Sequence, residues 1–392
     1  MEEEGSEMRV LLGSGASLRR LLGLWWPQTG RGRFRAAASA SVTLLFLTWL
    51  PSFTALKLIM DTSQELDEIA LCCLVIFVSF GFVTKVSFFI YESNTLHHLL
   101  RVLYEARSFK RHGKDCEGIR LHYQRLSHRM FIFMEVSMIQ ALAGWVSTPL
   151  LVRAFLTSED DSVESSRQFP VPLWFPGNIY LSPTYEILYI VQFLCIIVAP
   201  QTSICIDVFF IHMMLMVAAE LEVLNGNISA MKKVHRRFQG SEYQEQRQWN
   251  KEKHEEVDIK GHALVSNTGN SSTEDVLDEN MNLLLMKNIQ HHQVILGSSP
   301  ASKNVDWPPD LAGSEDQCWM TSEKLSNSAV SCDWTDCDTR FKRSLLVFLT
   351  VAGRPLEIIV GKTSKLSKEM LVQVLNGSYG LLNLLYHFHS TQ

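Results

Sequence analysis

Four long apolar stretches without charged side chains constrain this chain more than any other feature. They cover residues 36–56, 70–84, 136–152 and 187–206. The second continues past one lysine to Tyr91, and the third extends backward past Glu135 to residue 130. Apolar stretches of about 18 residues or more can cross a bilayer as helices. The sequence therefore predicts an all-α, polytopic membrane helical bundle.

Composition agrees with this class and excludes others. The 392 residues are 46% hydrophobic and 20% charged, below the usual charged fraction of about 25%. The formal net charge of −5 argues against nucleic acid as a partner. The eight cysteines are scattered along the chain rather than arranged as a disulfide framework.

The loops predict an orientation. Lys and Arg concentrate before residue 36, between residues 92 and 129, and after residue 219. The links 61–69 and 153–186 are instead rich in acidic residues. Because basic residues favour the cytoplasmic side, the N-terminus is expected in the cytoplasm.

Polarity changes along the chain predict four regions. Residues 1–35 form a cytoplasmic N-terminus, and residues 36–219 form a four-helix membrane region whose last helix continues past Asp207 into the cytoplasm. Residues 220–329 form a polar cytoplasmic segment, in which 240–279 is expected to be disordered and 297–316 reads as linker. Residues 330–392 contain an anchor helix and a last membrane helix.

The last apolar stretch carries a polar stripe. Five residues recur at spacings of 3, 4, 3 and 4, which places them on one helical face: Gln373, Asn376, Gly380, Asn383 and His387. Hydrogen bonding between helices is one interpretation. A water-lined pore formed by several copies is the other, with Leu384 and Phe388 beside the stripe as a hydrophobic gate.

The C-terminal segment carries a more specific pattern. It reads SCDWTDCDTRFKRSLLVFL at 331–349 and GRPLEIIVGK at 353–362, followed by Ser378 and Tyr379. Further matches are PTYEI at 183–187 and IQHHQVI at 289–295. In these motifs the chain resembles the insect odorant receptor family.

This resemblance implies a receptor rather than an enzyme. The family's subunits have seven helices and a cytoplasmic N-terminus, opposite to G-protein-coupled receptors. They assemble with a co-receptor into a heterotetrameric, non-selective cation channel that a small volatile organic ligand opens. The resemblance also implies the plasma membrane of sensory-neuron dendrites and contact with membrane lipid. It assigns Leu384 and Phe388 to the gate and His387 to a narrow polar ring.

One departure concerns the fifth and sixth helices of the family. Only residues 293–321 join His292 to Ser322, and they are polar. Two crossings need about 20 apolar residues each, so both helices are expected to be missing. A skipped exon, a pseudogene-like product or a mis-assembled gene model would each give this pattern. A truncated, non-conducting subunit that modulates co-receptor assembly is therefore the alternative function.

The expected ligand site follows from position in the outer halves of the second, third and fourth helices. Aromatic, mostly apolar walls suit a volatile ligand, although core packing or lipid contact explains each residue equally well. The candidates are Phe77, Phe80, Gly144, Trp145, Thr148, Tyr185, Tyr189 and Phe193.

Three charged residues interrupt or border the apolar stretches, namely Lys85, Glu135 and Asp207. Because a charged side chain at membrane depth is costly, each is a candidate for a functional role. The sequence predicts no catalytic residues, metal ligands or cofactor. It has no phosphate loop and no HExxH motif. The adjacent His291 and His292 make a poor chelate, because neighbouring residues point in different directions from a helix.

Overall fold

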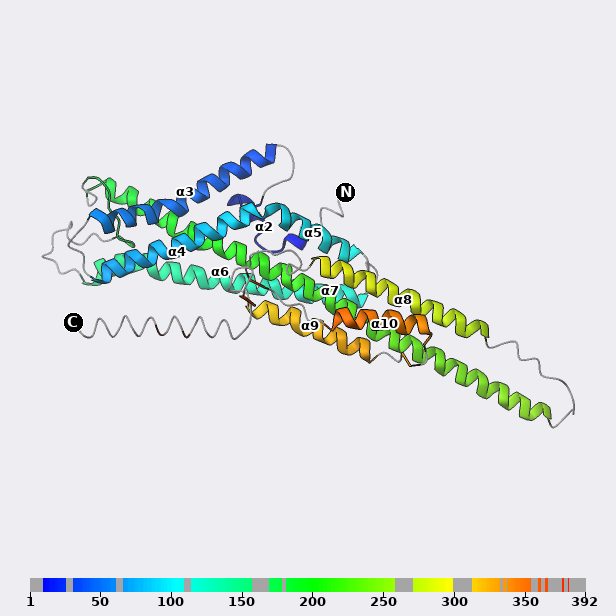
Figure 1. Ribbon diagram of the computed structural model, residues 1–392. Coiled ribbons are helices and arrows are strands. Elements are labelled where there is room, and N and C mark those ends of the chain that lie inside the picture. The colour runs from blue at the N-terminus through cyan, green and yellow to red at the C-terminus, as the bar shows by residue number, and fades with distance from the viewer. Residues whose placement is uncertain are drawn as a thin grey trace. The chain divides into compact units, whose positions relative to one another are not determined.

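The fold is described from a computed structural model of the chain (Figure 1). The structure describes residues 10–25, 31–60, 66–108, 114–156, 169–177, 181–257, 271–298, 312–331, 334–335, 337–353, 359–360, 364–365, 376 and 380.

Four helices are long and apolar enough to cross a membrane. They are α3 (Arg31–Met60), α4 (Leu66–Tyr91), α6 (Lys114–Leu156) and α7 (Thr184–Val257), as Figure 1 shows. Each contains one of the apolar stretches found in the sequence. The prediction of long apolar helices at these four stretches is therefore confirmed, and α7 does continue far beyond Asp207.

The membrane helices differ in what surrounds them. α4 exposes large apolar side chains such as Leu74, Phe77 and Phe88, as expected for a surface that contacts lipid tails. In contrast, every residue of α7 from Cys205 to Leu221 is buried. A helix that is apolar and buried all round lies inside a bundle.

The chain divides into two compact units. The first contains residues 1–98 and 124–213, and the second contains residues 99–123 and 214–392. In the first unit, α3 packs against α4, and the short α2 (Ala16–Leu21) packs against α3. The boundaries fall within α5 (Ser93–Ser108), α6 and α7, so these helices contribute to both units.

In the second unit, α10 (Thr339–Ala352) packs against α8 (Ser271–Ser298) and α9 (Ala312–Val330). The buried face of α10 repeats at helical spacing through Phe341, Leu345, Phe348 and Ala352. Asp338 caps its N-terminus by accepting a hydrogen bond from the Thr339 N–H. Strands β1 (Ile359–Val360) and β2 (Ser364–Lys365) form a short antiparallel ladder.

Helices extend into both the segment predicted to be disordered and the predicted linker. Residues 240–257 belong to α7 and residues 271–279 to α8, while α9 begins at Ala312, inside the predicted linker. The first of these segments is rich in Glu, Gln, Arg and Lys. These residues are polar, which favours a disorder prediction, but they also have high helix propensity.

The polar stripe of the last apolar stretch lies largely outside the described residues. Asn376 and Gly380 are helical and exposed. Gln373, Asn383, Leu384, His387 and Phe388 lie outside the described part of the chain, so their pore role stays a prediction.

Candidate functional site

An apolar cluster fills the membrane end of the first unit. Its buried members come from α3, α4, the 169–177 segment and α7, and α6 adds partly buried neighbours. The buried residues are Leu50, Val75, Val171, Cys195 and Ile196, and the partly buried ones are Phe46, Trp49, Leu71, Leu142, Val146 and Val191. Four helices that meet around one apolar core are a common location for a small-ligand site.

An aromatic group adjoins this cluster. The Tyr185 ring lies 4.9 Å from that of Phe169 and 5.8 Å from that of Tyr189. The Tyr189 hydroxyl donates to the Val146 carbonyl at 3.1 Å, and the Trp145 indole N–H donates to the Pro170 carbonyl at 3.1 Å. The polar atoms of Tyr189 and Trp145 are thus satisfied by backbone, which leaves their ring faces for apolar contacts.

The structure brings some of the predicted ligand residues together and separates others. Trp145, Tyr185 and Tyr189 adjoin the apolar cluster, and Gly144 and Thr148 lie on the same stretch of α6. Phe193 on α7 is 40% exposed. Phe77 and Phe80 are 79% and 70% exposed on α4, away from the buried face that carries Val75. None of these placements tests ligand contact itself.

Gln192 is a buried polar residue that sequence reasoning missed. Its side chain is fully buried beside the cluster, and its Nε2 donates to the Val171 carbonyl at 2.7 Å. Its Oε1 has no hydrogen-bond partner within the described structure. The feature of the sequence that could have revealed it is an amide side chain inside the uncharged 187–206 stretch. Polar groups in a membrane-spanning stretch are energetically costly unless they form hydrogen bonds.

The three charged candidates within the membrane helices each have a polar partner. Lys85 on α4 lies 2.6 Å from Asp207 Oδ1 on α7 and donates to the Ser203 hydroxyl at 3.0 Å. Gln201 Nε2 donates to Glu135 Oε1 at 2.7 Å, which joins α7 to α6. Because an unpaired charge at membrane depth is costly, these contacts fix how the three helices pack.

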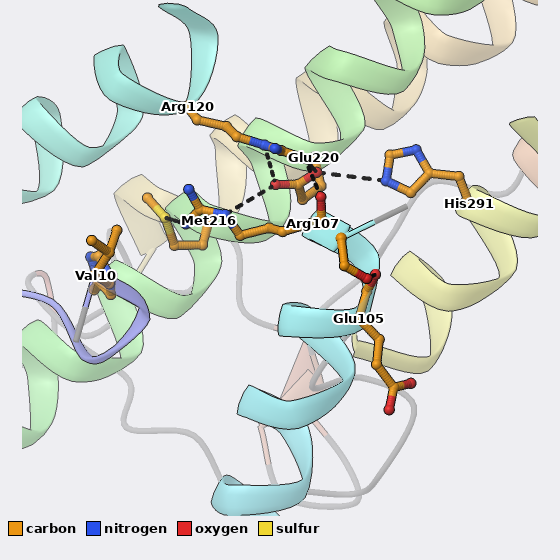
Figure 2. A network of polar contacts seen from close by, with 9 residues as sticks. Val10, Glu105, Arg107, Arg120, Met216, Glu220 and His291 are labelled. Atoms are coloured by element: carbon orange, nitrogen blue, oxygen red, sulfur yellow. Dashed lines mark hydrogen bonds and ion pairs between the residues drawn. The ribbon is translucent and has the colours of Figure 1, made fainter. Parts of the chain in front are cut away.

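A second buried charge site lies in the second unit (Figure 2). Glu220 on α7 is 1% exposed, and Arg120 on α6 holds it in a bidentate contact at 2.7 and 2.9 Å. Arg107 on α5 approaches at 3.9 Å, and His291 on α8 at 3.6 Å. We call these four residues the Glu220 centre. One carboxylate thereby connects four helices.

The neighbouring histidine has a different role. The His292 ring packs edge-on against Phe348 of α10, with ring centroids 5.1 Å apart. Burial, and to a smaller extent the adjacent His291, lower the pKa of His292 to about 4. His292 is therefore neutral near pH 7 and packs as an aromatic residue. Among the described side chains, no group of three His, Cys, Asp or Glu is arranged to hold a metal ion.

Comparison with known proteins identifies the family. The family model described as "7tm Odorant receptor" matches residues 66–297 and 317–379. The chain belongs to the 7tm odorant receptor family. This is a family of receptors, and the match is interrupted only at residues 298–316, between α8 and α9. No curated protein matches the chain.

The chain also resembles solved structures of other proteins in its fold. The insect olfactory receptor OR5 from Machilis hrabei, in complex with eugenol, aligns with a TM-score of 0.55 and 13% identity. The alignment covers 99% of this chain and 98% of that one. A second structure of OR5 from Machilis hrabei aligns with the same TM-score of 0.55, with 14% identity and coverage of 98% and 97%. At this identity the likeness shows the fold.

Proposed function

We propose that this receptor is a subunit that assembles with the odorant receptor co-receptor into a ligand-gated, non-selective cation channel for volatile ligands. The family match over most of the chain carries the proposal. The fold shared with OR5, which was solved in complex with eugenol, supports it. We expect the assembly in the plasma membrane of sensory-neuron dendrites, with the N-terminus in the cytoplasm.

We place the ligand between the aromatic group and the apolar cluster. Gly144, Trp145, Thr148, Tyr185, Tyr189 and Phe193 are the proposed contacts. Trp145 and Tyr189 offer ring faces whose polar atoms are already bonded to backbone. A small, uncharged ligand gains most of its affinity from such apolar surface. Phe77 and Phe80 are retained as weaker proposals, because their exposure also fits lipid contact.

The pore is proposed to form from the last helix. Gln373, Asn376, Gly380, Asn383 and His387 would line it, and Leu384 and Phe388 would close it by excluding water. Interhelical hydrogen bonding by the same stripe is the competing role. Substituting Asn383 by Leu separates the two, since a pore residue changes ion selectivity when the channel still assembles.

The test of this function is electrical. Co-expression with an insect co-receptor in oocytes is expected to give inward currents when a broad panel of volatile alcohols, esters and phenols is applied. Trp145→Ala should weaken the response to an active compound about tenfold or more. Leu74→Ala, on the exposed face of α4, is the matched control. Surface assembly without any evoked current would exclude ligand gating.

The interrupted family match supports a second function. The break at residues 298–316 lies where the fifth and sixth helices are expected, and the described residues contain four candidate membrane helices. A non-conducting subunit would co-purify with the co-receptor and lower its current. Sequencing the native transcript across codons 290 to 325 decides between the two, because about 40 additional apolar residues would restore an ordinary receptor.

A further inference from the structure

The buried face of α7 in the first unit carries one amide among aromatic and apolar side chains. Buried positions recur there at helical spacing, namely Tyr185, Leu188, Gln192, Cys195 and Ile196. Gln192 lies about one turn after Tyr189 of the aromatic group and one turn before Ile196 of the apolar cluster. Gln192 is therefore located where the two borders of the proposed ligand site meet.

The hydrogen bond to the Val171 carbonyl fixes the orientation of the Gln192 amide. The donor is Nε2, at 2.7 Å, and Val171 is itself a buried member of the apolar cluster. A backbone carbonyl can only accept, so the amide nitrogen has to face it and Oε1 has to face another direction. The amide oxygen thus has one defined position beside the cluster.

The amide oxygen of Gln192 has an unused capacity to accept a hydrogen bond. Oε1 is buried and accepts none within the described part of the chain. A carbonyl oxygen that is buried without a donor costs free energy, and native proteins leave few such groups without a partner. A donor that enters from outside the chain would remove this cost.

An ordered water is a poor candidate for that donor. A buried water forms about two to four hydrogen bonds, whereas the cluster members Leu50, Val75 and Ile196 have no polar side-chain atom. A molecule with one hydroxyl and an apolar body suits these surroundings better, because it needs one acceptor and otherwise only apolar contact.

We propose that Gln192 Oε1 accepts a hydrogen bond from the hydroxyl of the bound ligand, so that this receptor binds alcohols and phenols in preference to their ethers. The inference rests on the proposed ligand site, but it does not require the channel to conduct. An ether offers lone pairs only, which would leave two acceptors without a proton between them. An ammonium group could donate, but its charge is costly in an apolar membrane site.

The test measures ligand binding by the full-length chain, purified in detergent without the co-receptor. The probes are hexanol, octanol, phenylethanol and ethylphenol, each paired with its methyl ether. The dissociation constant follows from the rise of the unfolding temperature with ligand concentration. The native chain should bind an alcohol about tenfold more tightly than its ether, which corresponds to one net hydrogen bond.

Two variants separate recognition of the hydroxyl from a structural role. Gln192→Met keeps the length of the side chain and removes the amide, so both compounds of a pair should bind within about twofold of each other. Gln201→Met is the matched control, since it removes a half-buried amide of the same helix that bonds to Glu135 instead. It should keep the native ratio. Partition of each compound into detergent is the same for all three proteins, so comparison of their ratios cancels it.

The failures of the inference and of the ligand site can be told apart. An ether that binds the native chain as tightly as its alcohol overturns hydroxyl recognition and leaves the ligand site standing, and this comparison needs no variant. If Gln192→Met keeps the preference, or weakens both compounds equally, Gln192 only positions the 169–177 segment and the inference is wrong. If none of the compounds binds, the ligand site fails and the inference fails with it.

Discussion

Both units of this receptor bury ionised side chains, but the charge of these side chains is balanced differently in each unit. In the first unit, Lys85 and Asp207 neutralise each other one to one, and the Ser203 hydroxyl completes the site. In the second unit, the single carboxylate of Glu220 faces Arg107, Arg120 and His291. The first arrangement is a closed pair, and the second places two arginines and one histidine around a single carboxylate.

This difference has an energetic consequence. Replacing both members of a buried ion pair by apolar residues is often neutral or stabilising, whereas removing one member leaves a charge uncompensated. The Lys85–Asp207 pair can in principle be replaced as a unit. The Glu220 centre cannot, because removal of the carboxylate and one arginine still leaves a second arginine behind.

The largest effect is expected at Glu220. Glu220→Gln leaves Arg107 and Arg120 buried without their carboxylate and should lower the unfolding free energy by about 3–5 kcal/mol. Adding Arg120→Leu should not restore stability fully, since Arg107 also contacts this carboxylate in the native chain. Denaturant titration of the protein in detergent micelles measures both variants. Full rescue by the double variant would show that Arg107 contributes no charge to the centre.

At the membrane pair we expect a similar loss but a different rescue. Lys85→Met removes the cationic partner of the buried Asp207, at a cost of about 3 kcal/mol. Adding Asp207→Leu should bring the protein back to within about 1 kcal/mol of the native chain, in contrast to the Glu220 centre. The same titration tests this prediction. A double variant as unstable as Lys85→Met would contradict the closed-pair description.

Lowering the pH should destabilise the second unit through His292, which is next to His291 of the Glu220 centre. Its folded pKa of about 4 lies below its ordinary value of 6.5. Between these pH values the unfolded chain binds a proton that the folded chain excludes, so stability falls as the pH drops. The unfolding free energy should fall by about 2 kcal/mol at pH 5 because of His292. His292→Phe should remove this component, and His122→Gln, an exposed histidine, should keep it.

The smallest effect is expected in the aromatic group, where no charge is involved. Tyr189→Phe removes the hydrogen bond to the Val146 carbonyl and should cost about 1 kcal/mol. The ring stays, so we expect the sensitivity to an active ligand to change less than threefold. Dose–response currents from co-receptor co-expression measure it. A larger loss of sensitivity would mean that the hydroxyl itself contacts the ligand.

Much of this architecture could be predicted from the sequence. The four apolar stretches fixed the four candidate membrane helices, because transfer of apolar side chains into a bilayer depends mainly on local composition. The motifs at 331–349 and 353–362 predicted the family correctly. Disorder is predicted at 240–279, yet α7 continues through 240–257 and α8 begins at Ser271, because polar residues with high helix propensity are compatible with either state.

The contacts between charged and polar groups follow from the packing of separate helices and could not be predicted from the sequence. Nothing in the spacing of Lys85 and Asp207, or of Arg120, Glu220 and His291, predicts their contacts, since these residues are distant in sequence. The same holds for the adjacent Arg19 and Arg20, of which one is buried beneath Phe209 and the other exposed. Helix formation and the apolar character of a membrane-length helix depend on neighbouring residues, so both could be predicted from the sequence. The pairing of buried groups depends on how separate helices pack, so it follows only from the folded chain.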